Sequence, residues 1–287
     1  MKLPHASQLA ESRLSFPVAG LCTLFLGVVW VISSTLANRV CLFYGVSPTT
    51  TPMLAALASP ILAMVAVVCL EVWRTKTSPV IALYSLGFRP CTPLQLKIAA
   101  LGLAPILAGY ILIFSSIHQS PMPVPVVGLV IAKFIIAQGF GEEVIFRGFI
   151  FRHLRNGRPF WRASALSSAL FSLMHLANFT AGFTPGVLVS VCISMAFTFL
   201  LAFPLCALFE LGAGSIFGCC FFHVTFDSWN FFANADVNHK AGAVYLASVL
   251  ISGLVVLLAS KRSLTLHSRS SARRSWAETK RIPHSSE

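Results

Sequence analysis

Residues 125–151 read PVVGLVIAKFIIAQGFGEEVIFRGFIF, an apolar stretch as long as a membrane-spanning helix needs. Two adjacent carboxylates, Glu142 and Glu143, interrupt it, and Arg147 follows four residues after Glu143. A charged side chain at the centre of a bilayer costs roughly 3 kcal/mol or more, so such residues are rare without a task. The stretch therefore predicts a membrane helix whose polar residues serve a function.

The rest of the chain predicts a membrane protein too. Of its 287 residues, 56% are hydrophobic and only 10% are charged, whereas soluble domains carry roughly 25% charged residues. The strands of a membrane β-barrel would alternate apolar and polar residues, and these stretches do not. We predict an all-α, polytopic membrane helix bundle of about eight transmembrane helices, with spans near residues 16–37, 52–73, 98–117, 125–151, 163–179, 186–209, 213–232 and 242–260.

The placement of the basic residues predicts the orientation. With the N-terminus in the cytoplasm, seventeen of the 21 lysines and arginines fall in cytoplasmic segments, and only Arg39 and Lys240 fall in outer loops. The net charge of +12 thus matches membrane orientation, and we expect no nucleic-acid partner. We predict a multi-pass integral protein of the plasma (inner) membrane with both termini cytoplasmic.

Two regions differ in composition. Residues 1–260 form a single polytopic membrane domain, whereas residues 261–287 are rich in serine and arginine and predict a disordered basic cytoplasmic tail held near anionic lipid. The eight cysteines form no paired zinc motif or disulfide framework and are expected to be packing residues.

The charged residues of the span 125–151 have different expected partners. Glu143 and Arg147 are four residues apart on one helix and can form an ion pair that supports packing. Glu142 is rotated by about 100° from Glu143 and needs another partner. A carboxylate bonded to water is the form that a general base takes.

Three more polar residues lie in later apolar segments. His175 follows Phe171 by four residues and His223 precedes Asp227 by four, so each pair shares a helix face. Counted from the cytoplasmic ends of their spans, Glu142, His175 and His223 lie roughly 13, 18 and 15 Å deep. This similar depth predicts one site, whereas Glu210, at a span end, is expected to be a boundary residue.

These motifs, Glu142-Glu143-xxx-Arg147, Phe171-xxx-His175 and His223-xxx-Asp227 in this order, resemble the CAAX protease and bacteriocin-processing family. This family, also called the Abi family, contains the type II CAAX prenyl endopeptidases. The resemblance covers about residues 125–232, which would be the catalytic core, and the first 120 residues carry no matching motif. It implies a glutamate-dependent intramembrane endopeptidase without a metal or cofactor, acting on a membrane-anchored protein or peptide in the lipid bilayer.

The resemblance also implies roles for single residues. Glu142 and His175 would bind and activate the hydrolytic water, His223 and Asp227 would line the oxyanion site, and Glu143 and Arg147 would support the site structurally. Many family members carry asparagine where this chain has Asp227. An ionised aspartate donates no hydrogen bond, so Asp227 is either protonated or orients His223.

Two other readings remain open. Glu142, His175 and His223 would supply three ligands to a catalytic zinc ion, although the chain has no HExxH motif. Alternatively, the polar residues form a proton relay in a transporter, or pack the helices of a scaffold, and nothing is hydrolysed. Sensitivity to chelators tests the first reading, and detection of a cut substrate tests the second.

Overall fold

The computed structural model describes residues 14–47, 50–114, 124–176, 179, 183–228 and 239–279. Within these residues all regular structure is helical, as expected where no water is available to satisfy backbone groups. The helices are α1 (Phe16–Phe43), α2 (Thr51–Thr75), α3 (Pro79–Ser85), α4 (Pro93–Phe114), α5 (Val124–Lys133), η1 (Phe134–Glu142), η2 (Val144–Phe151), α6 (Arg152–Arg155), α7 (Phe160–Met174), α8 (Pro185–Leu211), α9 (Phe217–Asp227) and α11 (His239–Thr279).

Five helices of the described chain are long and apolar enough to cross a membrane. They are Phe16–Phe43, Met53–Thr75, Pro93–Ile113, Pro185–Leu211 and Lys240–Lys261. A polytopic helical membrane protein is therefore confirmed. The other three predicted spans coincide with the run α5–η1–η2 and with the shorter helices α7 and α9.

Some predicted segments end differently from the helices. Helix α11 continues past residue 260 to Thr279. The domain boundary at residue 260 and the disordered tail stay predictions. Parts of the predicted segments, at residues 177–178, 229–232 and 280–287, lie outside the described residues.

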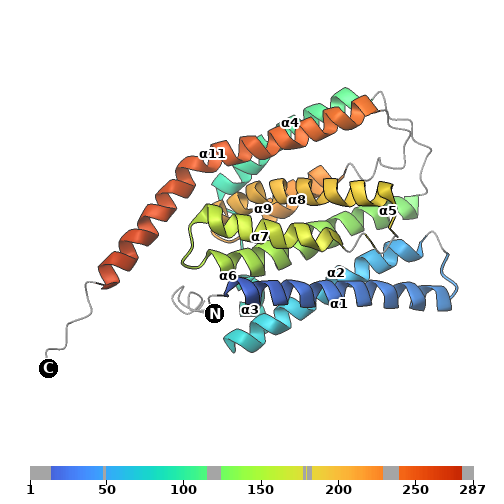
Figure 1. Cartoon of the computed structure of the whole chain (residues 1–287), viewed down its shortest axis with the longest axis horizontal. Coiled ribbons are helices and arrows are strands. Elements are labelled where there is room, and N and C mark those ends of the chain that lie inside the picture. Colours follow the sequence, from blue (N-terminus) through green and yellow to red (C-terminus); the bar gives the residue numbers. More distant parts are fainter. Residues whose placement is uncertain are drawn as a thin grey trace.

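The helices pack so that η1 lies in the middle of the bundle. Helix α1 packs along α2, and α11 packs along α4 on the other side (Figure 1). Between these pairs, η1 contacts both α2 and α9, and α7 packs on α8. Fully buried side chains of η2, α8 and α9, among them Phe149, Leu205 and Phe222, fill the interior.

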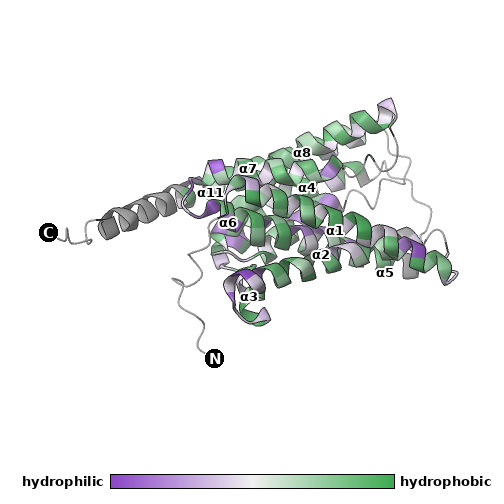
Figure 2. Cartoon of the chain, turned by 60° about the horizontal axis from the view of Figure 1, so that its bottom comes forward, coloured by the Kyte–Doolittle hydropathy of each residue, from purple (hydrophilic) through white to green (hydrophobic). Residues whose placement is uncertain are grey.

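The outer surface is apolar along the middle of the bundle. Large hydrophobic side chains such as Leu21 on α1, Ile111 on α4 and Val189 on α8 are exposed, as lipid contact requires. Hydrophilic residues gather at the end of the bundle near α3 and α6 (Figure 2). This is the end at which the basic residues of the predicted cytoplasmic loops lie.

The central helix has an unusual backbone. Helices α5, η1, η2 and α6 follow one another from Val124 to Arg155, and η1 and η2 are π-helices. A π-helix bonds residue i to residue i+5, is rare, and often occurs at functional sites. Its wider turn changes which side chains of this helix share a face.

Candidate active site

Two glycines let neighbouring helices approach η1 just before Glu142. A Cβ atom added to Gly139 would lie 2.8 Å from Val224 Cγ2 of α9, and one added to Gly141 would lie 2.7 Å from Pro60 Cβ of α2. Both separations are shorter than carbon atoms tolerate, so only glycine permits this packing. The close contact brings α2 and α9 up to the carboxylate of Glu142.

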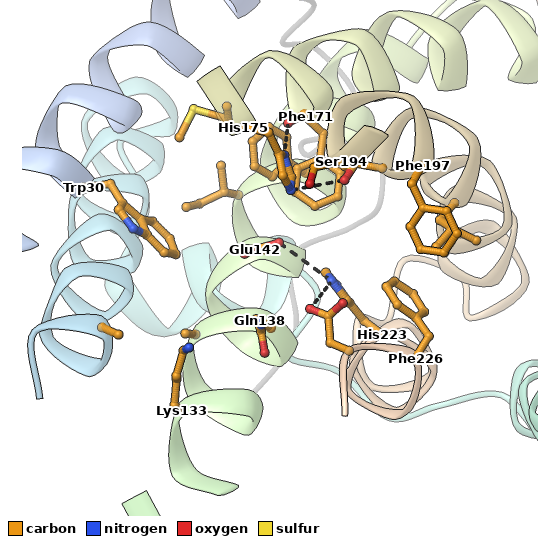
Figure 3. Close-up of a pocket in the computed structure, with 18 of the residues that line it drawn as sticks. Trp30, Lys133, Gln138, Glu142, Phe171, His175, Ser194, Phe197, His223 and Phe226 are labelled. Atoms are coloured by element: carbon orange, nitrogen blue, oxygen red, sulfur yellow. Dashed lines mark hydrogen bonds and ion pairs between the residues drawn. The ribbon is translucent and has the colours of Figure 1, made fainter. Parts of the chain in front are cut away.

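The predicted polar residues meet in one cavity. It has a volume of about 760 Å³, within the range typical of ligand pockets, and side chains of Glu142, His175, His223 and Asp227 line it (Figure 3). These residues come from η1, from the end of α7 and from α9. The similar depths inferred from the sequence thus correspond to a common location.

His223 links both glutamates through its two ring nitrogens. Its Nδ1 lies 2.6 Å from Glu143 Oε1, a short hydrogen bond that the ring donates. Its Nε2 lies 3.7 Å from Glu142 Oε2 and 3.4 Å from Asp227 Oδ2. Because Glu143 holds Nδ1, Nε2 faces the cavity and the two carboxylates there.

Glu143 and Arg147 are buried behind the cavity. The predicted ion pair forms, with Arg147 Nη1 3.0 Å from Glu143 Oε1, and both side chains are almost completely buried. The guanidinium also lies 4.7 Å from the centre of the Phe171 ring, in reach of a cation–π interaction. Glu143 therefore connects Arg147 to His223, a link that the spacing of Glu143 and Arg147 did not reveal.

His175 is positioned by α8. Its Nε2 lies 3.1 Å from Thr198 Oγ1, and its Nδ1 lies 3.4 Å from the carbonyl oxygen of Phe171. Ser172 Oγ donates a 2.7 Å hydrogen bond to the carbonyl oxygen of Met195, which ties the end of α7 to α8. Thr198 is not recognisable from the sequence, because a lone hydroxyl in an apolar helix carries no distinctive pattern.

Glu71 is a second buried charged residue that was not among the predicted site residues. This carboxylate lies inside the predicted span 52–73, is fully buried, and is bonded by Arg74, Arg152 and His153. A charged residue inside an apolar stretch was the signal in the sequence that could have identified it. By contrast Glu210, expected at a span boundary, lies at the end of α8 with Oε1 2.8 Å from Arg155 Nε.

Comparison with known proteins identifies the chain over most of its length. Residues 16–229 match the family model described as Rce1-like type II CAAX prenyl endopeptidase, which extends well beyond the motif-bearing stretch 125–232. No curated protein and no solved structure matches the chain. Four residues of the motifs that resemble this group of peptidases, Glu142, His175, His223 and Asp227, line the cavity. The chain belongs to the Rce1-like family of type II CAAX prenyl endopeptidases.

Proposed function

We propose that this protein hydrolyses a peptide bond near the terminus of a membrane-associated protein or peptide, inside the membrane, with water activated by Glu142 and His175. The observation that carries the proposal is the cavity in which a carboxylate and two imidazoles meet within an apolar bundle. Peptide hydrolysis needs a base for water and donors for the oxygen that becomes negative. Membership of a peptidase family supports the same reaction class.

The proposed catalytic cycle uses side chains that line the cavity. Glu142, whose side chain is 21% exposed, takes a proton from water held between it and His175. The water oxygen attacks the carbonyl carbon of the substrate, and the carbonyl oxygen becomes negative. Glu142 then gives its proton to the leaving nitrogen as the carbon–nitrogen bond breaks. The base is thereby restored.

His223 is the donor proposed for the developing oxyanion. Glu143 accepts the proton of Nδ1, which leaves Nε2 directed at the cavity. Asp227, 3.4 Å from Nε2, orients the ring and stabilises its charged form. Glu143 and Arg147 support this arrangement from behind.

The zinc alternative finds little support in the geometry. Among the described residues, no three His, Cys, Asp or Glu side chains are arranged to hold a metal ion. We propose a reaction without a metal. Activity that is lost with a chelator and restored by zinc would contradict it.

We further propose eight spans with both termini on the cytoplasmic side of the inner membrane. The support is the distribution of basic residues and the five apolar helices, joined by α5–η1–η2, α7 and α9. A reporter fused after Lys261 is expected to be active only in its cytoplasmic form. An externally active reporter would contradict this topology.

The decisive experiment compares the termini of membrane proteins by mass spectrometry in cells with the wild type and with Glu142→Ala. We expect a small set of proteins to carry truncated termini only with the wild type. Purified enzyme should then cut those same proteins, and Glu142→Gln should not. Identical termini in both strains would favour the transporter or scaffold reading.

A further inference from the structure

The end of α9, which carries Asp227, is held by other helices. The last carbonyl groups of a helix have no partner within it, and in an apolar surrounding each needs one. In α9 the carbonyl oxygen of Val224 accepts a hydrogen bond from the backbone N–H of Ser228 at 2.9 Å. The carbonyl oxygens of Thr225 and Phe226 accept from side-chain hydroxyl groups. Two of these hydroxyl groups come from other helices, so the position of the last turn of α9 depends on them.

The two hydroxyl groups belong to tyrosines of α4 and α11. Tyr245, on α11, donates a short hydrogen bond to the carbonyl oxygen of Phe226. Tyr110, on α4, places its hydroxyl 3.1 Å from the carbonyl oxygen of Thr225 and 2.7 Å from Ser228 Oγ. Ser228 Oγ itself donates to the carbonyl oxygen of Thr225 at 2.6 Å, so Tyr110 donates to Ser228. Both tyrosines therefore hold the end of α9 from outside it.

The two tyrosines lie side by side on tightly packed helices. The centres of their rings are 6.1 Å apart, and α4 packs along α11 (Figure 1). Gly109, next to Tyr110, permits this packing, because a Cβ atom there would overlap with Ser248 of α11. Tyr245 is almost completely buried and lines the cavity together with Asp227. The pair thus forms a firm support at the edge of the active site.

This support bears on the contact between Asp227 and His223. Asp227 stands between Phe226 and Ser228, and both of these neighbours are bonded to a tyrosine. Asp227 Oδ2 lies 3.4 Å from His223 Nε2, and beyond about 3.5 Å such a contact is no longer a hydrogen bond. The other ring nitrogen is held by Glu143 at 2.6 Å. A small movement of the last turn of α9 would therefore separate the carboxylate from the ring.

We propose that Tyr110 and Tyr245 are positioning residues of the active site, which hold the end of α9 so that Asp227 stays against His223. Both hydroxyl groups bond to α9 and its end, so they act through Asp227 and not on the substrate. This inference rests on the proposed function, in which His223 donates to the oxyanion. It adds two residues from helices that carry none of the motifs, and Tyr245 also lies beyond residue 229, where the match to the family model ends.

The test removes one hydroxyl group at a time, in Tyr245→Phe and Tyr110→Phe, because phenylalanine preserves the ring and its packing. The purified full-length enzyme is assayed with a farnesylated peptide, cysteine followed by three aliphatic residues, and rates are normalised to folded protein. Each variant should lower kcat by about two- to tenfold, the equivalent of one hydrogen bond, and leave KM unchanged. Tyr44→Phe, which changes an exposed tyrosine at the end of α1, should behave as wild type.

A double-mutant comparison separates positioning from packing. Asp227→Ala removes the carboxylate, and Tyr245→Phe added to it should lower kcat no further, because the residue through which the hydroxyl acts is gone. A tyrosine that only packs the helices would lower kcat by the same factor with and without Asp227. Equal factors in the two backgrounds, an unchanged kcat, or a change confined to KM would each overturn the proposal. Tyr110→Phe gives the same comparison where Tyr245→Phe yields too little folded protein.

A spectroscopic measurement distinguishes failure of this inference from failure of the proposed function. In protein labelled with ¹⁵N-histidine, the ring signals of His223 are those that disappear in His223→Gln. Tyr245→Phe should shift the Nε2 signal of His223 when Asp227 is present, and should not shift it further in Asp227→Ala. That result supports the positioning role even where the wild type cuts no peptide, in which case the proposed function alone fails. A signal that Tyr245→Phe leaves unmoved, or moves equally in both backgrounds, overturns the positioning role.

Discussion

Two buried clusters of charge in this protein differ in how completely their carboxylates are bonded. Glu71 is bonded on both oxygens, by Arg152 at 2.5 Å and Ser85 at 3.3 Å on one, and by Arg74 at 3.0 Å and His153 at 3.2 Å on the other. No capacity remains there for a ligand. This cluster connects α2 to α3 and α6 and stabilises the packing of these helices.

The cluster in the cavity is bonded differently on its two sides. Behind the cavity, Glu143 contacts His223 at 2.6 Å and Arg147 at 3.0 Å. On the cavity side, Glu142 and Asp227 approach His223 only to 3.7 and 3.4 Å and keep 21% and 22% of their side chains exposed. A carboxylate whose oxygens all have hydrogen-bond partners, such as Glu71, stabilises the fold. A carboxylate with long contacts beside a cavity, such as Glu142, is available for chemistry.

The sharpest test of this distinction is Glu142→Gln. Removing a general base is expected to lower the cleavage rate by about 10²- to 10⁴-fold, while the protein unfolds at nearly the same temperature. Cleavage of a substrate found by terminal mass spectrometry gives the rate, and thermal unfolding in detergent gives the stability. Glu210→Gln, which changes a carboxylate paired at a helix end, is the matched control. Full cleavage by Glu142→Gln would make the mechanism wrong.

Glu71→Gln should give the reverse result. Four cationic or polar partners would lose their buried anion, and breaking such a buried ion pair costs about 3–5 kcal/mol. We expect a marked loss of stability and yield, with an unchanged cleavage rate per folded molecule. Active-site titration of the folded fraction separates the two quantities. A stable but inactive Glu71→Gln protein would contradict a purely structural role for Glu71.

Glu143 and Arg147 form one ion pair, but only Glu143 also bonds His223. The two residues, which the sequence predicted to have the same supporting role, are therefore expected to differ when substituted. Arg147→Met is expected to reduce stability alone. Glu143→Gln should also slow cleavage by about tenfold, because it weakens the hydrogen bond that orients His223. This factor corresponds roughly to the free energy of one hydrogen bond. Rates normalised to folded protein measure this. Equal rates in the two variants would return Glu143 to a purely structural role.

The smallest expected effect is that of Asp227→Asn. If Asp227 orients His223 and stabilises its charged form, loss of the negative charge should slow cleavage several-fold and change its pH dependence. If Asp227 is instead a protonated donor to the oxyanion, asparagine should preserve or raise the rate. Cleavage measured against pH for both proteins distinguishes these roles. An unchanged rate with an unchanged profile would make Asp227 a packing residue.

Much of the architecture was accessible from the sequence, because hydrocarbon imposes simple rules. Long apolar runs predicted the helices α1, α2, α4, α8 and α11, since only a helix satisfies its backbone in lipid. Spacing by four predicted that Arg147 would reach Glu143 and that Asp227 would lie near His223. Common depth predicted that Glu142, His175 and His223 would share one site.

Other features depended on contacts between distant segments. The expected 100° turn between Glu142 and Glu143 suggested separate partners, yet His223 approaches both. Thr198 meets His175 only because α8 packs on α7. Glu71 finds two of its partners, Arg152 and His153, about eighty residues further along the chain.

The sequence by itself determined a polytopic helical membrane protein and the set of polar residues that its apolar segments carry. Those properties follow from local composition and from the cost of placing charge in lipid. Only the tertiary structure decided which carboxylate is saturated and which faces the cavity. It also decided that Lys133 lines the same cavity as Glu142, because π-helical turns, packed against α2 and α9 at Gly139 and Gly141, realign the side chains of one helix.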